Sequence, residues 1–247
     1  TYAIPSRFLN TETKIFHYPS DVESNKVVLI LKGLYGEHDP NRGGASASWD
    51  NTLTALLQKE YHIILIRSGR LPHETRIGKF EGKTFQEECG DLEDSVRYVQ
   101  EYVVQQKSTW SVVANSFGGT TLLGMPTILS IMETIIFINS GCGRSPTTTK
   151  PLVSTLFETT QLLEPLQKYT GSFFFLNGGK DTVVPLESKK MIFDSLRSAT
   201  HKEWMDFPEL DHELEDPQTK ESKLPEIVTG LLLSRVVENK TDSVILS

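Results

Sequence analysis

Residues 110–121 read Trp-Ser-Val-Val-Ala-Asn-Ser-Phe-Gly-Gly-Thr-Thr, and they set Ser116 between small residues where the backbone must change structure. The apolar run that ends at Ala114 is typical of a buried strand, whereas the residues from Gly118 to Met125 favour a helix. Almost no chain is left between them for a loop, so Ser116 must lie on a sharp turn in a strained conformation. The small residues two positions away on either side leave room for such a turn. The serine hydroxyl would then stand at the N-terminus of a helix, where the helix dipole favours negative charge.

This turn resembles the nucleophile elbow of the α/β-hydrolase family, in which a serine lies in the pattern G-x-S-x-G, with alanine here in place of the first glycine. The family carries its serine, acid and histidine in that order, after successive strands. The segment Asn177–Pro185 resembles the family's acid-bearing turn and contains Asp181, and the segment Pro208–Asp216 resembles its histidine loop and contains His212. The resemblance therefore implies a catalytic triad of Ser116, Asp181 and His212.

These residue types suit an acyl-transfer mechanism. A serine hydroxyl is a weak nucleophile at neutral pH, so the imidazole of His212 would accept its proton while the carboxylate of Asp181 holds the other ring nitrogen. Each residue also has a simpler explanation, because an aspartate in a glycine-rich turn often only shapes the turn and a histidine among acidic residues is often only solvated. The occurrence of all three in the family's order favours the triad. If the acid is not Asp181, then Asp206 or Asp211 is the next choice.

The family also stabilises the oxyanion with two backbone N–H groups, one from the residue after the serine and one from the loop after an early strand. Phe117 follows Ser116 and supplies the first donor. The run Lys32-Gly-Leu-Tyr-Gly36 follows an apolar strand and stands where relatives usually carry His-Gly and an apolar residue. The resemblance therefore assigns the second donor to Leu34, with Tyr35 in reserve, because a lysine at the preceding position leaves a backbone donor in place.

Composition narrows the class of protein. The chain has 247 residues, of which 38% are hydrophobic, so we expect one α/β domain over residues 1–247. The net charge of −7, without a basic block, argues against a nucleic-acid partner. No apolar run approaches the roughly 20 residues of a membrane span, so we expect no span. No signal peptide is evident, which favours a cytoplasmic location, although the chain starts at Thr1 and a removed targeting segment stays open.

Two cysteines, Cys89 and Cys142, are expected to be free thiols, and no Cys or His spacing indicates a metal site. The family resemblance likewise implies no cofactor. Cys142 follows an expected strand in a glycine-rich loop, so it and Tyr35 are our candidates for residues that line the substrate pocket. A reactive role for Cys142 is the less favoured reading, because no histidine lies near it in the sequence.

Apolar runs alternate with amphipathic stretches, which predicts a mostly parallel sheet with helices on both faces. The expected strands are 27–31, 62–66, 111–114, 134–138, 173–176 and 203–207, with an N-terminal antiparallel hairpin of 7–9 and 14–17 that brings the total to eight. The expected helices are 49–59, 85–105, 118–125, 151–169, 187–198 and 224–237. This twisted eight-stranded sheet is the α/β-hydrolase architecture that the resemblance implies.

Many relatives insert a lid before the strand that carries the acid. Here that interval offers only a short lid-like insertion at about residues 144–170, with one helix at 151–169. The resemblance therefore implies a serine hydrolase that cleaves a carboxylic ester of short to medium acyl length, rather than a lipase with a large interfacial lid. A ligand receptor on the same fold, or a lyase or perhydrolase that uses the same triad, stays open, because a fold does not dictate a function. Sequence does not separate ester from thioester or amide hydrolysis.

Overall fold

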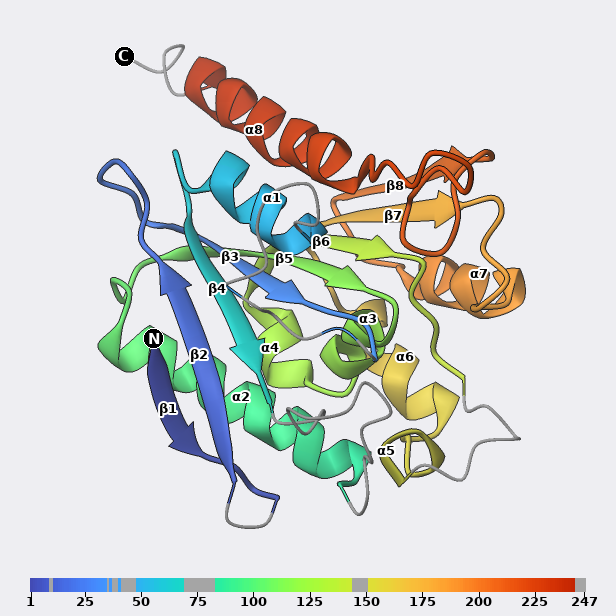
Figure 1. The fold of residues 1–247 in the computed structure, drawn as a ribbon, viewed down its shortest axis with the longest axis horizontal. Coiled ribbons are helices and arrows are strands. Elements are labelled where there is room, and N and C mark those ends of the chain that lie inside the picture. The colour runs from blue at the N-terminus through green and yellow to red at the C-terminus, as the bar shows by residue number, and fades with distance from the viewer. Residues whose placement is uncertain are drawn as a thin grey trace.

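The computed structural model of the chain describes residues 1–8, 11–34, 36, 40, 48–68, 83–143 and 151–242, and of residues 235–242 the backbone only. Its centre is an eight-stranded sheet in the order β1-β2-β4-β3-β5-β6-β7-β8 (Figure 1). The strands are β1 (Tyr2–Pro5), β2 (Glu12–Tyr18), β3 (Lys26–Leu31), β4 (His62–Arg67), β5 (Thr109–Asn115), β6 (Met132–Ile138), β7 (Ser172–Gly178) and β8 (His201–Phe207). The pairs β1–β2 and β2–β4 are antiparallel and all other pairs are parallel, as predicted.

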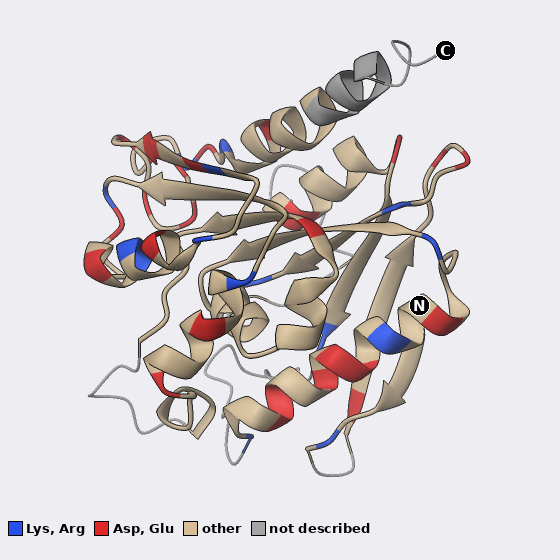
Figure 2. Ribbon diagram, turned by 180° about the vertical axis from the view of Figure 1, so that it is seen from behind, with Lys and Arg blue, Asp and Glu red and all other residues tan. Residues whose placement is uncertain are grey.

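The parallel strands β3 to β7 are mostly apolar because helices cover both of their faces, whereas the edge strand β8 is partly exposed. Every residue of β7, Ser-Phe-Phe-Phe-Leu-Asn-Gly, is buried, which is typical of a strand in the middle of an α/β sheet. Phe175 of β7 stacks on Trp204 of β8 with ring centroids 4.7 Å apart. Charged residues lie mainly on the helices and loops, and the central strands carry few of them (Figure 2). The carboxyl ends of these strands therefore meet at one edge of a rigid sheet.

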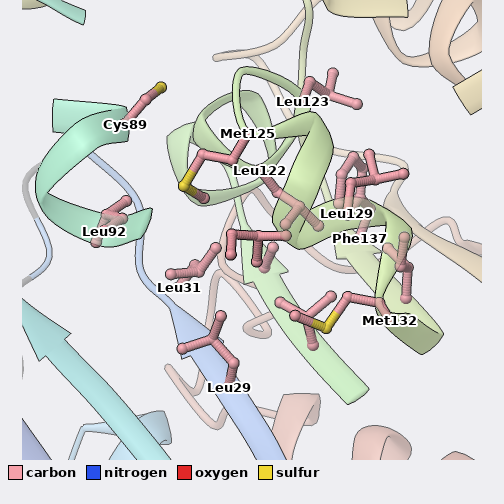
Figure 3. Close-up of a cluster of buried hydrophobic side chains, with 14 of the residues drawn as sticks. Leu29, Leu31, Cys89, Leu92, Leu122, Leu123, Met125, Leu129, Met132 and Phe137 are labelled. Carbon is pink, nitrogen blue, oxygen red and sulfur yellow. The ribbon is translucent and has the colours of Figure 1, made fainter. Parts of the chain in front are cut away.

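The helices form a layer on each side of the sheet. They are α1 (Trp49–Leu57), α2 (Phe85–Tyr102), α3 (Phe117–Leu123), α4 (Pro126–Ser130), α5 (Pro151–Ser154), α6 (Thr159–Gln167), α7 (Leu186–Ser195) and α8 (Leu224–Asp242). Helices α1 and α8 pack on one face, and α2 to α7 contribute to the apolar cluster on the other. Figure 3 shows part of that cluster, which includes Leu29 and Leu31 of β3, Leu92 of α2 and Leu122 of α3. Within the described part of the chain, no helix combines the length and the hydropathy needed to cross a bilayer.

The N-terminal hairpin differs from the prediction in its first strand. We expected residues 7–9 to pair with 14–17, but β1 is Tyr2–Pro5, and Tyr2 pairs with Ile15. The backbone N–H of Arg7 instead donates to Asp91 of α2 at 2.5 Å, and its guanidinium binds Asp94. Contacts with a helix far away in the sequence thus take Arg7 out of the sheet.

The predicted helix at 151–169 is also wrong, because the structure contains two short helices, α5 and α6, in its place. The hydroxyl of Thr155 accepts a hydrogen bond from the Phe85 N–H at 2.9 Å and donates to the carbonyl of Pro151. Glu158 then starts α6 with a capping box that includes Gln161. Helix α4 was not predicted; Pro126 starts it immediately after α3.

Candidate active site

Ser116 occupies the sharp turn between β5 and α3. Its backbone φ of 51° and ψ of −120° are rare for a residue with a side chain, and a hydrogen bond of 2.8 Å from its N–H to the carbonyl of Ile138 holds the turn against β6. This strain is where the sequence predicted it. The turn presents the Ser116 hydroxyl at the carboxyl edge of the sheet, beside the N-terminus of α3.

Close packing explains the two glycines that follow. A Cβ on Gly118 would lie 2.3 Å from the carbonyl oxygen of Leu31, and one on Gly119 would lie 2.2 Å from the hydroxyl oxygen of Ser140. No side chain fits at either position, because α3 runs directly against the ends of β3 and β6. Ala114, which stands at the position of the first glycine in the G-x-S-x-G pattern, is fully buried inside β5.

The structure brings Ser116, His212 and Asp181 together in one hydrogen-bonded chain. Nε2 of His212 is 2.9 Å from Oγ of Ser116, and Nδ1 of His212 is 3.0 Å from Oδ1 of Asp181. With a proton on Nδ1 held by the carboxylate, Nε2 presents its lone pair to the serine hydroxyl. The Asp181 carboxylate is fully buried, whereas the His212 side chain keeps 15% exposure toward the cleft described below.

Asp181 is strongly held in its ionised form. Burial by itself raises the pKa of this carboxyl, but hydrogen bonds from His212, Lys189 and the Val183 N–H outweigh it and lower the pKa to about 2. The Val183 N–H donates to Oδ1 at 2.7 Å and the Val184 N–H does so at 3.2 Å. The turn therefore fixes Oδ1 by backbone contacts, independently of the histidine.

The two aspartates that were kept as alternative acids have other partners. Oδ1 of Asp206 accepts hydrogen bonds from Asn177 and from the indole of Trp204, each at 2.8 Å. Oδ1 of Asp211 accepts from the backbone N–H groups of Glu213 and Glu215, so it shapes the loop that carries His212. Neither carboxylate is bonded to the imidazole.

The loop after β3 lies beside the serine, where the second oxyanion donor was expected. A Cβ on Gly33 would lie 3.7 Å from Ser116 Oγ, and the Gly36 N–H donates to the carbonyl of Gly33 at 3.0 Å to close a turn around Leu34. Phe117 is the first residue of α3, at the positive end of that helix. Leu34 and Phe117 both line the cleft. Tyr35 lies outside the described residues.

Lys32, where the resemblance led us to expect a histidine, forms an ion pair with a buried carboxylate. Its ammonium is 2.9 Å from Oδ1 of the fully buried Asp50 and lies over the ring of Trp49 at 5.7 Å. These contacts anchor the end of β3 to the start of α1. The lysine thus stabilises the loop that presents Leu34.

Ser116 and His212 open into a cleft of about 1080 Å³. One part of its wall is apolar and includes Val153, Leu156, Val183 and Val184. Another part is polar, and its charged members are Lys32, Glu213, Glu215, Lys220 and Glu221. Burial raises the pKa of both Glu213 and Glu215, and repulsion between neighbouring carboxylates adds to the effect. This size and mixture of surfaces fit a small organic ligand.

Cys142 lies behind the cleft rather than in it. The neighbouring residues Gly141 and Gly143 line the cleft, but the Cys142 side chain is 99% buried and its sulfur is 3.5 Å from the carbonyl oxygen of Ser188. Burial raises the pKa of this thiol. The structure therefore corrects its assignment as a pocket residue. Cys89 is also buried and free.

Sequence reasoning missed Lys189 and Asn139. Lys189 is 2% exposed and its Nζ lies 2.6 Å from Oδ2 of Asp181. Asn139, with a φ of 44°, donates to the backbone carbonyls of Asp211 and His212. A lysine in a charged helix and an asparagine after a strand carry no signal of such contacts. Over the described residues, no three His, Cys, Asp or Glu side chains gather closely enough to hold a metal ion.

Comparison with known proteins places this geometry in a known architecture. No protein-family model matches the sequence, and no curated protein matches it either. Solved structures do. Est1E from Butyrivibrio proteoclasticus, with bound ferulic acid, is 13% identical and superposes over 96% of this chain and 98% of its own with a TM-score of 0.69.

Two further structures match over similar lengths. A carboxyl esterase from Bacillus coagulans is 12% identical over 94% of this chain and 97% of its own, with a TM-score of 0.70. A monoacylglycerol lipase from Paleococcus ferrophilus is 16% identical over 91% of this chain and 99% of its own, with a TM-score of 0.65. At such identities the likeness concerns the fold, and it agrees with the sheet order and the elbow described above: the chain has the α/β-hydrolase fold.

Proposed function

We propose that this protein is a serine hydrolase that cleaves a carboxylic ester through an acyl-enzyme on Ser116. The observation that carries the proposal is the hydrogen-bonded chain from Asp181 through His212 to Ser116, which ends in a cleft of about 1080 Å³. The strained turn at Ser116 adds support, because such strain is concentrated at functional sites. Two structural neighbours are named as a carboxyl esterase and a monoacylglycerol lipase.

In this mechanism, Oγ of Ser116 attacks the ester carbonyl carbon while Nε2 of His212 takes the hydroxyl proton. Negative charge moves onto the carbonyl oxygen, and we assign its stabilisation to the backbone N–H groups of Phe117 and Leu34. The imidazolium then gives its proton to the departing alcohol. A water molecule, deprotonated by the same imidazole, then attacks the acyl carbon. The bond from that carbon to Oγ breaks, the imidazolium returns the proton to Ser116, and the carboxylic acid leaves. Asp181 stays ionised throughout, as its pKa of about 2 favours.

We infer a short to medium acyl group from the walls of the cleft. Val153 of α5 and Leu156, just after it, offer an apolar surface, and they belong to a segment of two short helices rather than a long lid. The polar wall around Glu213 and Lys220 suits the alcohol side of the ester better than a second acyl chain. The acyl group would therefore lie against the apolar wall.

Purified protein should release alcohol from chromogenic acetate and butyrate esters in a burst, and a fluorophosphonate should label it. Ser116→Ala should abolish both, whereas Ser111→Ala, a change of the serine within β5, should abolish neither. Equal labelling of the Ser116→Ala variant would disprove the nucleophile assignment.

Thermal stabilisation by an ester without product over hours would favour a receptor, and peracid formation or carbon–carbon cleavage would favour the other enzymes that use this triad. A maximum with long-chain triglyceride emulsions would contradict the short acyl preference.

A further inference from the structure

The side of Asp181 that faces away from His212 contacts a buried lysine. Lys189 extends from α7, and its ammonium lies 2.6 Å from Oδ2 of Asp181, 2.8 Å from Oδ1 of Asn139 and 2.9 Å from Oδ1 of Asn177. An ammonium group has three N–H donors. Here it donates hydrogen bonds to the two asparagine oxygens and forms an ion pair with the carboxylate, so its charge is held in one place.

The oxygens around this ammonium belong to three separate parts of the site. Asn177 is in β7 and Asn139 follows β6, while Asp181 lies on the turn after β7. Asn139 also donates from Nδ2 to the carbonyl of His212 at 2.9 Å and accepts the Gly178 N–H at 2.9 Å. Lys189 therefore contacts the acid-bearing turn directly, and it is linked to the histidine loop through Asn139.

A buried lysine needs a reason, because removing an ammonium from water is costly unless it is paired. Its pairing with Asp181 also changes the charge around the histidine. Among the described residues, Glu213 interacts with the charges of His212, Glu215, Lys32 and Asp211, and Asp206 on β8 binds Asn177, which is also a partner of Lys189. Among the described residues, Lys189 is the cation in direct contact with the triad carboxylate.

We propose that Lys189 is a positioning residue of the triad: it holds Oδ2 of Asp181 so that Oδ1 faces His212, and its charge keeps the Asp181–His212 pair unprotonated at lower pH. This inference rests on the proposed hydrolase function. Lys189 touches no part of the cleft and acts through Asp181.

The sign of the electrostatic effect follows from Coulomb's law. His212 must be neutral to accept the serine proton, and protonation of the Asp181–His212 pair stops the reaction. A nearby positive charge opposes that protonation, whichever of the two groups takes the proton. Loss of the charge therefore makes the pair protonate at higher pH. For a unit charge one carboxylate away in a buried site, the shift is about one pH unit or more.

The test compares Lys189→Met and Lys189→Gln with the wild type and with Lys190→Met, which removes an exposed charge from the next position of the same helix. The pH profile of kcat/KM is measured with a soluble ester, together with Tm. We expect the acid limb of the kcat/KM profile to lie about one pH unit or more higher in both Lys189 variants than in the wild type. We also expect kcat at the optimum to fall about tenfold with little change in KM, because the carboxylate is less well placed. Lys190→Met should match the wild type.

An unchanged acid limb in folded Lys189 variants would overturn the proposal, as would a loss confined to Tm. Failure of both variants to fold would assign the lysine to stability alone and would also overturn it. The proposed function fails differently, because a wild type that neither turns over esters nor reacts with a fluorophosphonate is not a serine hydrolase. Activity in the wild type with an unmoved acid limb in the variants rejects only the role of Lys189.

Discussion

Asp181 is the residue on which most of the polar contacts of the site converge. Its carboxylate accepts hydrogen bonds from His212, Val183 and Val184 and forms an ion pair with Lys189. In the proposed mechanism, the carboxylate orients the imidazole and stabilises the imidazolium that would form as Ser116 attacks. These contacts predict that Asp181 is essential for the reaction rate and that it also contributes to the stability of the site.

Asp181→Asn should lower kcat/KM by on the order of 10⁴, because an amide favours the wrong imidazole tautomer. The measurement is steady-state hydrolysis of a soluble ester, with circular dichroism to show that the variant is folded. Asp206→Asn is the matched control, since Asp206 contacts Asn177 and Trp204 rather than the imidazole. Near-normal activity of Asp181→Asn together with loss of activity in Asp206→Asn would assign the role of the triad acid to Asp206 on β8.

At the scale of elements, the position of Ser116 depends on how closely α3 approaches the strands beneath it. Gly118 is in backbone contact with the end of β3, so nothing there can move aside for a Cβ 2.3 Å from the Leu31 carbonyl oxygen. Gly230 of α8 also lies in a helix, but a Cβ there would meet nothing within 4 Å. Gly118 is therefore required by close packing, whereas nothing packs against Gly230 and a side chain would fit there.

Gly118→Ala should lower the free energy of unfolding by about 2 kcal/mol or more, because α3 must shift away from β3. The same shift should displace Ser116 and reduce activity beyond what the loss of stability explains. Gly230→Ala should instead stabilise the protein by roughly 0.5–1 kcal/mol, because alanine is the better helix former. Urea unfolding of both variants measures these changes. A neutral Gly118→Ala would mean that the elbow helix packs less tightly than described.

At the scale of the whole molecule, several acidic groups have altered affinities for protons. The pKa of Asp181 is lowered from 3.8 to about 2, and hydrogen bonds from the Gln218 and Thr219 N–H groups lower that of Asp216. A carboxyl with a lower pKa in the folded than in the unfolded protein stabilises the fold above its ordinary pKa. That contribution is lost as the pH falls through the folded value. Glu213 and Glu215, whose pKa values are raised by burial, act in the opposite direction.

The wild type should therefore lose stability between about pH 4 and pH 2, in part because Asp181 takes up a proton there. The difference in Tm between wild type and Asp181→Asn should be largest above this range and should shrink toward pH 2, where the wild-type carboxyl becomes neutral as well. Ser116→Ala keeps the carboxylate and should follow the wild type. Scanning calorimetry across this range tests the prediction, and a constant difference at every pH would contradict it.

The sequence by itself determined the features that depend on local pattern. Buried parallel strands are nearly continuous apolar runs, so β3 to β7 could be predicted from the pattern of the sequence, whereas the edge strand β8 carries charged residues. The strained turn at Ser116 followed from the short distance between a strand and a helix signal, and the order of Ser116, Asp181 and His212 after successive strands predicted that they would meet at one edge. Their hydrogen-bonded chain is the arrangement that this prediction required.

Only the tertiary structure decided the features that depend on contacts between distant segments. Arg7 left the sheet because Asp91 and Asp94 of α2 bind it, and no local pattern around residue 7 records that partner. The hydroxyl of Thr155 bonds the start of α2 where a single helix was expected. Nothing in the sequence around Lys189 indicates its partner, but the packing of α7 buries it against Asp181. Local periodicity reports which residues avoid water, whereas the partner of a buried polar group is set by how the layers pack.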